Sequence, residues 1–115
     1  MGELCGQVFD IDPAIRFAGI IDRMGKLVAG GMRPGLQPLE SIKDMDRLYL
    51  EFALRNAMRR EFDGDFGPTI YAMSERERIK IATFPMPGDD SLLLISMERG
   101  KPHDRIISRV LELVR

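Results

Sequence analysis

The chain has 115 residues, of which 44% are hydrophobic and 30% are charged, and its formal net charge is -1 at pH 7. This size and composition are typical of one folded domain over residues 1–115, and they exclude an intrinsically disordered chain. The balance of 17 basic and 18 acidic residues provides no overall positive field, so nucleic acid is not expected as a partner.

The single cysteine, Cys5, permits no intrachain disulfide and indicates a reducing compartment. We interpret it as a small buried apolar residue, with a redox role as the alternative. The longest apolar runs, such as Leu92–Ile95, are far too short to span a membrane, and the first residues do not form a signal peptide. The sequence therefore predicts a cytoplasmic protein without a membrane partner.

The first elements predicted are a short helix over residues 3–10 and a β-hairpin. Asp12-Pro13 ends the helix, because the residue before a proline avoids the α region. The strands cover residues 16–22 and 26–31, and Gly25 in the turn supplies a positive φ. Both strands are apolar on both faces, a pattern typical of strands with helices on either side. We therefore expect a central, buried hairpin.

A connector rich in glycine and proline, Gly30–Pro38, follows the hairpin. It is not a phosphate-binding loop, because no Gly-Lys-Ser/Thr sequence ends it. We interpret it as a crossover loop, with a loop that binds a small ligand or a partner as the alternative.

The strongest helical pattern begins at Ser41, a plausible N-cap with Asp44 three residues later, and is expected to run to Phe62 and stop at Gly64. At about 100° per residue, its apolar residues form two faces instead of one. The first face holds Met45, Leu48, Tyr49, Phe52 and Ala53, the second holds Leu50, Leu54, Ala57 and Met58, and Arg47, Glu51 and Arg55 form a polar wedge. A helix this apolar is expected to pack on its own sheet and on something else.

Three strands are predicted next, over residues 69–74, 79–84 and 91–97, and they form a meander. The run Ser91–Met97 is apolar on both faces and is expected at the centre of the sheet, whereas the shorter run Thr69–Ser74 suits an edge. A closing helix follows, with Pro102 placed in its first turn. Its one-sided apolar stripe holds Ile106, Ile107, Val110, Leu111 and Val114. The order α-β-β-α-β-β-β-α predicts an α+β fold with a five-stranded antiparallel sheet.

No residue pattern supports catalysis, a cofactor or a metal site. Asp65-Phe66-Gly67 spells the kinase magnesium motif, but the chain is too short for a kinase and has no catalytic-loop sequence. Asp63 and Asp65 resemble the start of a calcium loop whose later ligands are missing, so a helix-ending turn is the better interpretation. The only histidine, His103, is expected to be a solvated residue at a helix start. Four serines could in principle pair with it, but none has nucleophile-elbow spacing: Ser74, Ser91, Ser96 and Ser108.

Arg55, Arg59 and Arg60 cluster at the end of the long helix. Cations are favourable near a helix C-terminus, which explains the cluster. A patch for an anion or an acidic partner, extended by Arg76, Arg78 and Lys80 if the third and fourth strands lie nearby, is the alternative. The intervening Glu75 and Glu77 argue against nucleic acid.

The element order and the hairpin resemble the roadblock/dynein-light-chain family, a branch of the profilin-like and longin-like folds. The resemblance rests on Ala18–Asp22, Gly25 and Leu27–Ala29, which occupy the places of that family's Asp-ended strand, glycine turn and Leu-Val strand. The chain also resembles a group of small archaeal proteins that share the IRFAGIID…GKLVAGG opening. The matched motif is structural and transfers no catalytic residue.

The resemblance implies a scaffold that dimerises through the long helix and the adjacent third strand, and that binds small GTPases or assembles regulatory complexes. On this chain the surface for a dimer or a partner would hold Leu50, Leu54, Ala57, Met58, Ile70, Tyr71 and Met73, within a strand run Thr69–Met73. The chain departs from the family in its long Gly30–Pro38 connector and in Asn56, Arg59 and Arg60, which interrupt the apolar faces of the helix.

The sequence thus predicts a non-catalytic regulatory or scaffold module that acts as a homodimer. The alternative is a small-molecule sensor with a cavity between the sheet and the long helix, lined by Tyr49, Phe52 and Met73. An enzyme is not expected, because no polar constellation supports one.

Overall fold

The computed structural model describes residues 2–39 and 42–115 of the chain. The elements are α1 (Gly2–Phe9), β1 (Ile15–Ile21), β2 (Leu27–Met32), α2 (Ile42–Arg60), α3 (Asp63–Phe66), β3 (Ala72–Glu75), β4 (Ile79–Pro85), β5 (Leu92–Glu98) and α4 (Asp104–Val114). This is the predicted order with one addition, the short helix α3.

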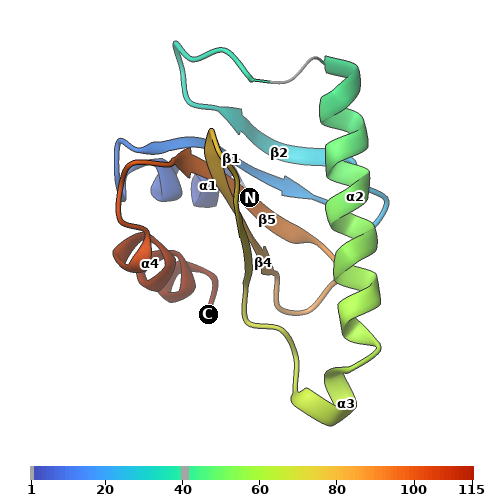
Figure 1. The fold of residues 1–115 in the computed structure, drawn as a ribbon. Helices are drawn as coiled ribbons and strands as arrows, with labels where there is room; N and C mark the ends of the chain where they lie inside the picture. Colours follow the sequence, from blue (N-terminus) through green and yellow to red (C-terminus); the bar gives the residue numbers. More distant parts are fainter. Residues whose placement is uncertain (1, 40–41) are drawn as a thin grey trace.

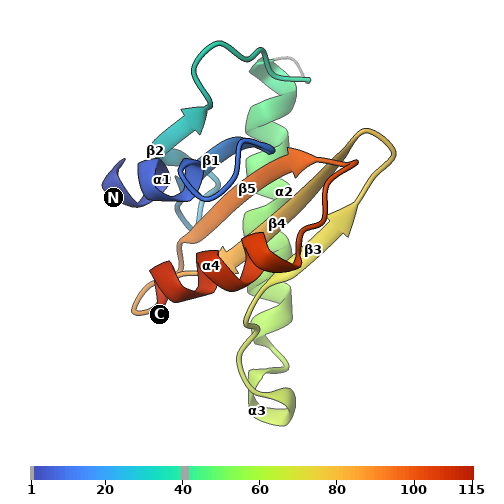
Figure 2. The same ribbon diagram turned by 90° about the vertical axis from the view of Figure 1, so that its left-hand side faces the viewer.

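The five strands form one antiparallel sheet in the order β2-β1-β5-β4-β3. Helices α1 and α4 lie on one face of the sheet, and the long helix α2 crosses the other (Figures 1 and 2). The predicted α+β class, with helices on both faces, is confirmed. The meander β3-β4-β5 is also confirmed, with β3 at an edge.

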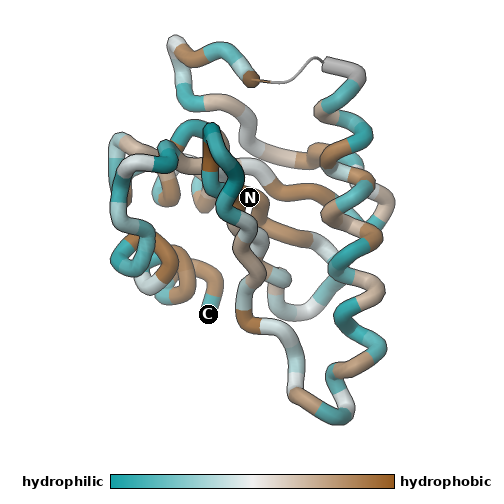
Figure 3. Tube along the Cα trace, in the orientation of Figure 1, coloured by the Kyte–Doolittle hydropathy of each residue, from teal (hydrophilic) through white to brown (hydrophobic). Residues whose placement is uncertain are grey.

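Strand β5 shows why the sheet needs cover on both faces. Its alternate residues Leu93, Ile95 and Met97 belong to the core under α1 and α4. Leu92 and Leu94 belong to a second core under α2. The central strand β5 and its neighbour β1 lie between α4 and α2 and are among the most apolar parts of the chain (Figure 3). A strand apolar on both faces is buried on both, as the pattern of β5 predicted.

The same reasoning was wrong for half of the hairpin. Strand β1 is buried along almost its whole length, but β2 is an edge strand, and Val28 keeps 49% of its surface exposed. A shift in register between Ile20 and Ile21 marks a bulge opposite Val28. Bulges are common at sheet edges, where they interrupt the ladder and discourage pairing with another chain. The hairpin is therefore central through β1 alone.

The turn between β1 and β2 places a glycine against the long helix. Gly25 has a φ of 82°, and a Cβ built on it would lie 2.6 Å from the Cα of Leu50 in α2. The Asp22 carboxylate accepts hydrogen bonds from the backbone N–H groups of Lys26 and Met24, which hold the pKa of that carboxyl below its usual range. Gly25 is thus required both by the turn and by the close approach of α2.

Several predicted boundaries were wrong in detail. Helix α2 ends at Arg60, and Gly64 lies inside α3 instead of stopping the long helix. The expected N-cap, Ser41, lies outside the described residues. Strand β3 begins at Ala72, so residues 69–71 lie outside it. Pro102 precedes α4, because the first α-type hydrogen bond runs from the N–H of Ile107 to the carbonyl of His103.

Candidate interaction surface

The long helix α2 has one apolar face inside the protein and one outside. Tyr49, Phe52 and Ala53 are buried against the sheet. Leu50, Leu54 and Met58 are exposed, and Leu54 keeps 55% of its surface accessible. Exposed leucines occur singly on many proteins, but a run at helical spacing on one element is unusual. The two faces predicted from the wheel are therefore present, and only the first is covered by this chain.

The polar residues that interrupt the end of α2 have separate environments. Asn56 is buried with the inner face, whereas Arg60 forms an ion pair with Asp90 in the β4–β5 connection. Arg55 pairs with Glu51 one turn earlier at 3.6 Å. Two of the three clustered arginines, Arg55 and Arg60, thus have intrachain partners, while Arg59 lines a groove beside the helix.

An open groove of ≈ 1810 Å³ runs between α2 and the β3–β4 side of the sheet. Its helix wall includes Leu50, Leu54 and Met58, and its sheet wall includes Ala72 and Ser74. Charged residues of both signs line it as well: Arg47, Glu51, Arg55, Arg59, Glu75, Arg76, Glu77 and Arg78. A surface that mixes apolar and charged groups in this way suits a protein partner better than nucleic acid.

The residues predicted from the third strand divide between two sides. Ile70 and Tyr71 are exposed and precede β3. The Tyr71 ring stacks on Phe84 with centroids 6.0 Å apart, and Phe84 belongs to the core under α4. Met73 borders the groove but packs on that same core. The structure thus brings Leu50, Leu54 and Met58 together, while Tyr71 and Met73 anchor the strand to the opposite face.

One aromatic pair on this side of the molecule was not singled out from the sequence. Phe62 precedes the short helix α3, and Phe66 is the last residue of α3. Their rings stack with centroids 6.1 Å apart, and both residues are exposed. Helix α3 projects beyond the sheet (Figure 1). Their spacing of four residues could have flagged them, because residues four apart share a helix face.

The pocket between α2 and the sheet is small. A cavity of ≈ 40 Å³ is lined by Tyr49 together with Leu48, Phe17 and Leu94. Pockets that enclose small molecules hold about 300–1,000 Å³. Phe52 and Met73, expected to line a sensor cavity with Tyr49, border the open groove instead.

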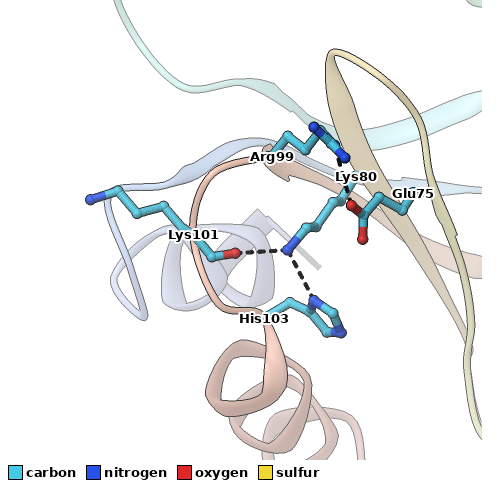
Figure 4. A network of polar contacts seen from close by, with 5 residues as sticks. All are labelled: Glu75, Lys80, Arg99, Lys101 and His103. Atoms are coloured by element: carbon cyan, nitrogen blue, oxygen red, sulfur yellow. Dashed lines mark hydrogen bonds and ion pairs between the residues drawn. The ribbon is translucent and has the colours of Figure 1, made fainter.

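A polar network fixes the start of α4 on the other face of the sheet (Figure 4). Lys80 on β4 is 6% exposed. Its ammonium donates to the backbone carbonyl of Lys101 at 2.7 Å and lies 3.1 Å from Nδ1 of His103. Beside it, Arg99 pairs with Glu75 at 3.2 Å. An ammonium group can only donate hydrogen bonds, so Nδ1 of His103 is the acceptor. In the neutral imidazole the proton is then on Nε2.

His103 therefore differs from its prediction. It does lie at the helix start, as N-cap of α4, but its side chain is half-buried against Lys80 instead of solvated. The sequence pattern gave no signal for this contact, because Lys80 and His103 come from different elements. Its role here is to hold α4 on the sheet.

Two further residues have structural roles on that face. Cys5 is buried as predicted, and burial raises the pKa of its thiol. Arg33, which follows β2, donates to the backbone carbonyls of Ile15, Phe9 and Asp12, and its guanidinium lies 4.9 Å from the Phe9 ring centroid. Arg33 thereby ties α1 to the start of β1.

Among residues 2–39 and 42–115, no group of three or more His, Cys, Asp or Glu side chains is arranged to hold a metal ion. The helices in the same part of the chain are too short or too polar to cross a membrane.

The arrangement of these elements is that of a Roadblock/LC7 domain. A Roadblock/LC7 domain from Streptomyces avermitilis superposes with a TM-score of 0.73 at 14% identity, over 99% of this chain and 91% of that one. The gliding protein MglB from Thermus thermophilus gives 0.75 at 18% identity, over 97% and 83%. An MglB with a tetrameric arrangement gives 0.69 at 17% identity, over 97% and 85%. The chain thus has the roadblock fold that its hairpin and element order indicated.

By sequence, residues 3–115 match the model of DUF6659, described as a family of unknown function, and the chain belongs to that family. No curated protein matches the sequence.

Proposed function

We propose that this chain is a non-catalytic regulatory or scaffold module that acts through protein–protein interaction as a homodimer. One observation carries the proposal: the second apolar face of α2 is exposed along the groove beside the edge strand β3. The proposed interface consists of Leu50, Leu54, Ala57, Met58, Ile70, Tyr71 and Met73. Met73 would contribute through its groove side, and Tyr71, whose ring stacks on Phe84, through the part of its surface that stays exposed. Exposed apolar side chains gathered on one face of a helix are a feature of interaction sites on soluble proteins.

The edge strand adds a second mode of contact. β3 is hydrogen-bonded to β4 on one side and ends the sheet on the other. An edge strand offers backbone N–H and C=O groups that another strand can pair with. The helix face and the strand edge lie on one side of the molecule, so a single partner could cover both.

Partners of two kinds follow from the resemblance to roadblock proteins: a second copy of the chain, and a further protein for which a small GTPase is the implied class. The tetrameric arrangement of one MglB supports self-association as a property of this fold. An enzymatic role has no support from the side chains: the ring nitrogens of His103 face Lys80 and Asp104, and Cys5 is buried.

Light scattering coupled to size exclusion tests the homodimer. The wild type is expected to be dimeric at tens of micromolar, and Leu54→Glu is expected to be a folded monomer. Leu113→Glu is the matched control, because Leu113 is an exposed leucine on α4, away from α2, and it should remain dimeric. A wild type that stays monomeric, and is unaltered by Leu54→Glu, contradicts the proposal.

The small-molecule sensor is not favoured. The pocket beneath α2, at ≈ 40 Å³, is far smaller than the about 300–1,000 Å³ of small-molecule sites, and the large groove is open and lined by charges of both signs. Pull-down with the wild type and with Leu54→Glu as bait would identify the further protein partner, which the variant should lose if it binds the same face.

A further inference from the structure

The short helix α3 and the residue before it carry two aromatic side chains on the part of the molecule that projects beyond the sheet (Figures 1 and 2). Phe66 is 84% exposed and Phe62 is 55% exposed. Their ring planes differ by 21° and their centroids lie 6.1 Å apart, so each ring shields one face of the other. Two exposed rings held side by side form a compact apolar patch of the kind that partners cover.

The backbone fixes the position of this aromatic pair. The N–H of Phe66 donates to the carbonyl of Phe62 at 2.9 Å, and the N–H of Gly67 donates to the carbonyl of Asp63 at 2.8 Å. The N–H of Phe62 donates in turn to the carbonyl of Arg59, so the segment continues directly from the last turn of α2. A surface that is already ordered loses less conformational entropy when a partner binds.

Three carboxylates flank the two rings: Glu61, Asp63 and Asp65. Residues 61–66 contain no basic side chain. Among residues 2–39 and 42–115, the ion pairs include none of these three carboxylates, whereas the adjacent Arg60 is paired with Asp90. The aromatic pair therefore lies in a negative surface whose charge is not neutralised by the described part of the chain.

This combination of groups selects the chemistry of a partner. Carboxylates repel phosphates, so nucleic acid and an anionic membrane surface are both unsuited to the site. An arginine matches both features, because its planar guanidinium stacks on an aromatic face and also pairs with a carboxylate through two parallel N–H bonds. The ammonium of a lysine is a compact point charge without this planar fork.

We propose that α3 and its flanking carboxylates form a docking site for an arginine-bearing surface of a different protein. A guanidinium of the partner stacks on the open face of Phe66 and pairs with one of the flanking carboxylates. The site lies beyond the last turn of α2 and does not include Leu54. It adds a second contact surface to the interaction module, and it rests on the proposed function only for the class of partner, which is a protein.

Peptide titration tests the chemistry of the site. The probe is a labelled synthetic amphipathic helix with arginines on one face and leucines on the other, compared with the same peptide carrying lysine or glutamate. We expect the lysine peptide to bind at least about threefold more weakly and the glutamate peptide not to bind. Phe66→Ser should weaken the arginine peptide about tenfold, as should Asp63→Asn combined with Asp65→Asn, whereas Phe66→Tyr keeps the ring and should stay within about twofold of wild type.

Matched variants separate this site from the rest of the surface. Leu113→Ser and Glu3→Gln alter an exposed apolar residue and an exposed carboxylate on other helices, and both should leave the affinity unchanged. Leu54→Glu should also bind like wild type, whether it is monomeric or dimeric, so this result is independent of the homodimer. Equal binding of the arginine peptide and either other peptide, an unchanged affinity in Phe66→Ser, or a loss in Leu54→Glu would overturn the proposal.

Photo-cross-linking in cells that produce the chain identifies what contacts the site. With p-benzoylphenylalanine in place of Phe66, we expect an adduct on a different protein, through a segment that contains arginine. The adduct should disappear when Asp63→Asn and Asp65→Asn are added, and it should not form with the photoreactive residue in place of Leu113. An adduct only on a second copy of this chain, on lipid or on a segment without arginine would overturn the proposal, as would the absence of any adduct.

Discussion

Helices α2 and α4 bury their apolar residues to different extents, although each packs on one face of the same sheet. The apolar stripe of α4 lies on one side of the helix, and its residues Ile106, Ile107 and Val110 are all buried. α2 carries two apolar faces, of which one is buried and one is exposed. A helix with a single stripe satisfies its hydrophobic surface within the chain, whereas a helix with two faces has surface left for a partner.

The largest expected effect is a loss of stability on substitution in the core under α4, which distinguishes this helix from the exposed face of α2. Ile106→Ala in α4 should lower the free energy of unfolding by about 2–5 kcal/mol, because it leaves a cavity in a filled core. In urea titrations this loss should be the same at low and high protein concentration.

Leu54→Ala in α2 is the contrasting variant. At low concentration it should change the free energy of unfolding by no more than about 0.5 kcal/mol, as expected for an exposed residue. At high concentration it should be clearly less stable than wild type, because a dimer stabilises the fold by mass action. Equal losses at both concentrations would place Leu54 in the monomer core and contradict the comparison.

The second prediction concerns how α2 is seated on the hairpin. Gly25 already has a positive φ, which is strained for a residue with a side chain, so Gly25→Ala introduces backbone strain. It also places a Cβ 2.6 Å from the Cα of Leu50. Gly35→Ala is a matched control, because its φ is +89° and nothing lies within 4 Å of its Cβ. We expect the control to lose about 1 kcal/mol from backbone strain. Gly25→Ala should lose about 1–3 kcal/mol more through overpacking, and it should also weaken the dimer because α2 must move.

Thermal unfolding of both glycine variants measures this difference. If the two variants lose the same stability, the close approach between the turn and α2 contributes nothing beyond the positive φ.

The smallest expected effect concerns the start of α4. Lys80→Met removes the buried ammonium that bonds the Lys101 carbonyl and Nδ1 of His103. Leaving these two acceptors without their donor should cost about 1–2 kcal/mol in chemical denaturation. Lys101→Met should be near neutral, since that residue contributes its backbone carbonyl and its side chain is not the donor. A neutral Lys80→Met would mean that water replaces the ammonium at the half-buried His103.

The sequence patterns were most reliable for elements whose apolar surface is buried by other parts of the same chain. The meander, the central strand β5 and the stripe of α4 follow from apolar periodicity alone, because each of these surfaces is buried inside the chain. The pattern was misleading for β2, whose Val28 is apolar but exposed at a bulged edge. Hydrophobicity indicates that a surface is suited to burial, but it does not say whether this chain supplies the cover.

For the candidate surface, the wheel of α2 identified Leu50, Leu54 and Met58 from the sequence. It did not show that Met73 and the Tyr71 ring pack toward α4, because the faces of a strand are assigned only when its register with β4 is known. The contact between Lys80 and His103 was hidden for a similar reason. It joins residues 23 positions apart that meet only when α4 docks on the sheet.

The sequence by itself determined the order of elements and the two apolar faces of α2, because local periodicity and turn residues encode these features. The roadblock fold was indicated by the resemblance of the hairpin and of that element order to a known family. Only the tertiary structure decided which of those faces is covered, which strands lie at the edges, and that Gly25 fits beneath α2. These depend on contacts between distant segments, and the physical reason is steric: one sheet face has room for α1 and α4, while the other is partly covered by a single helix.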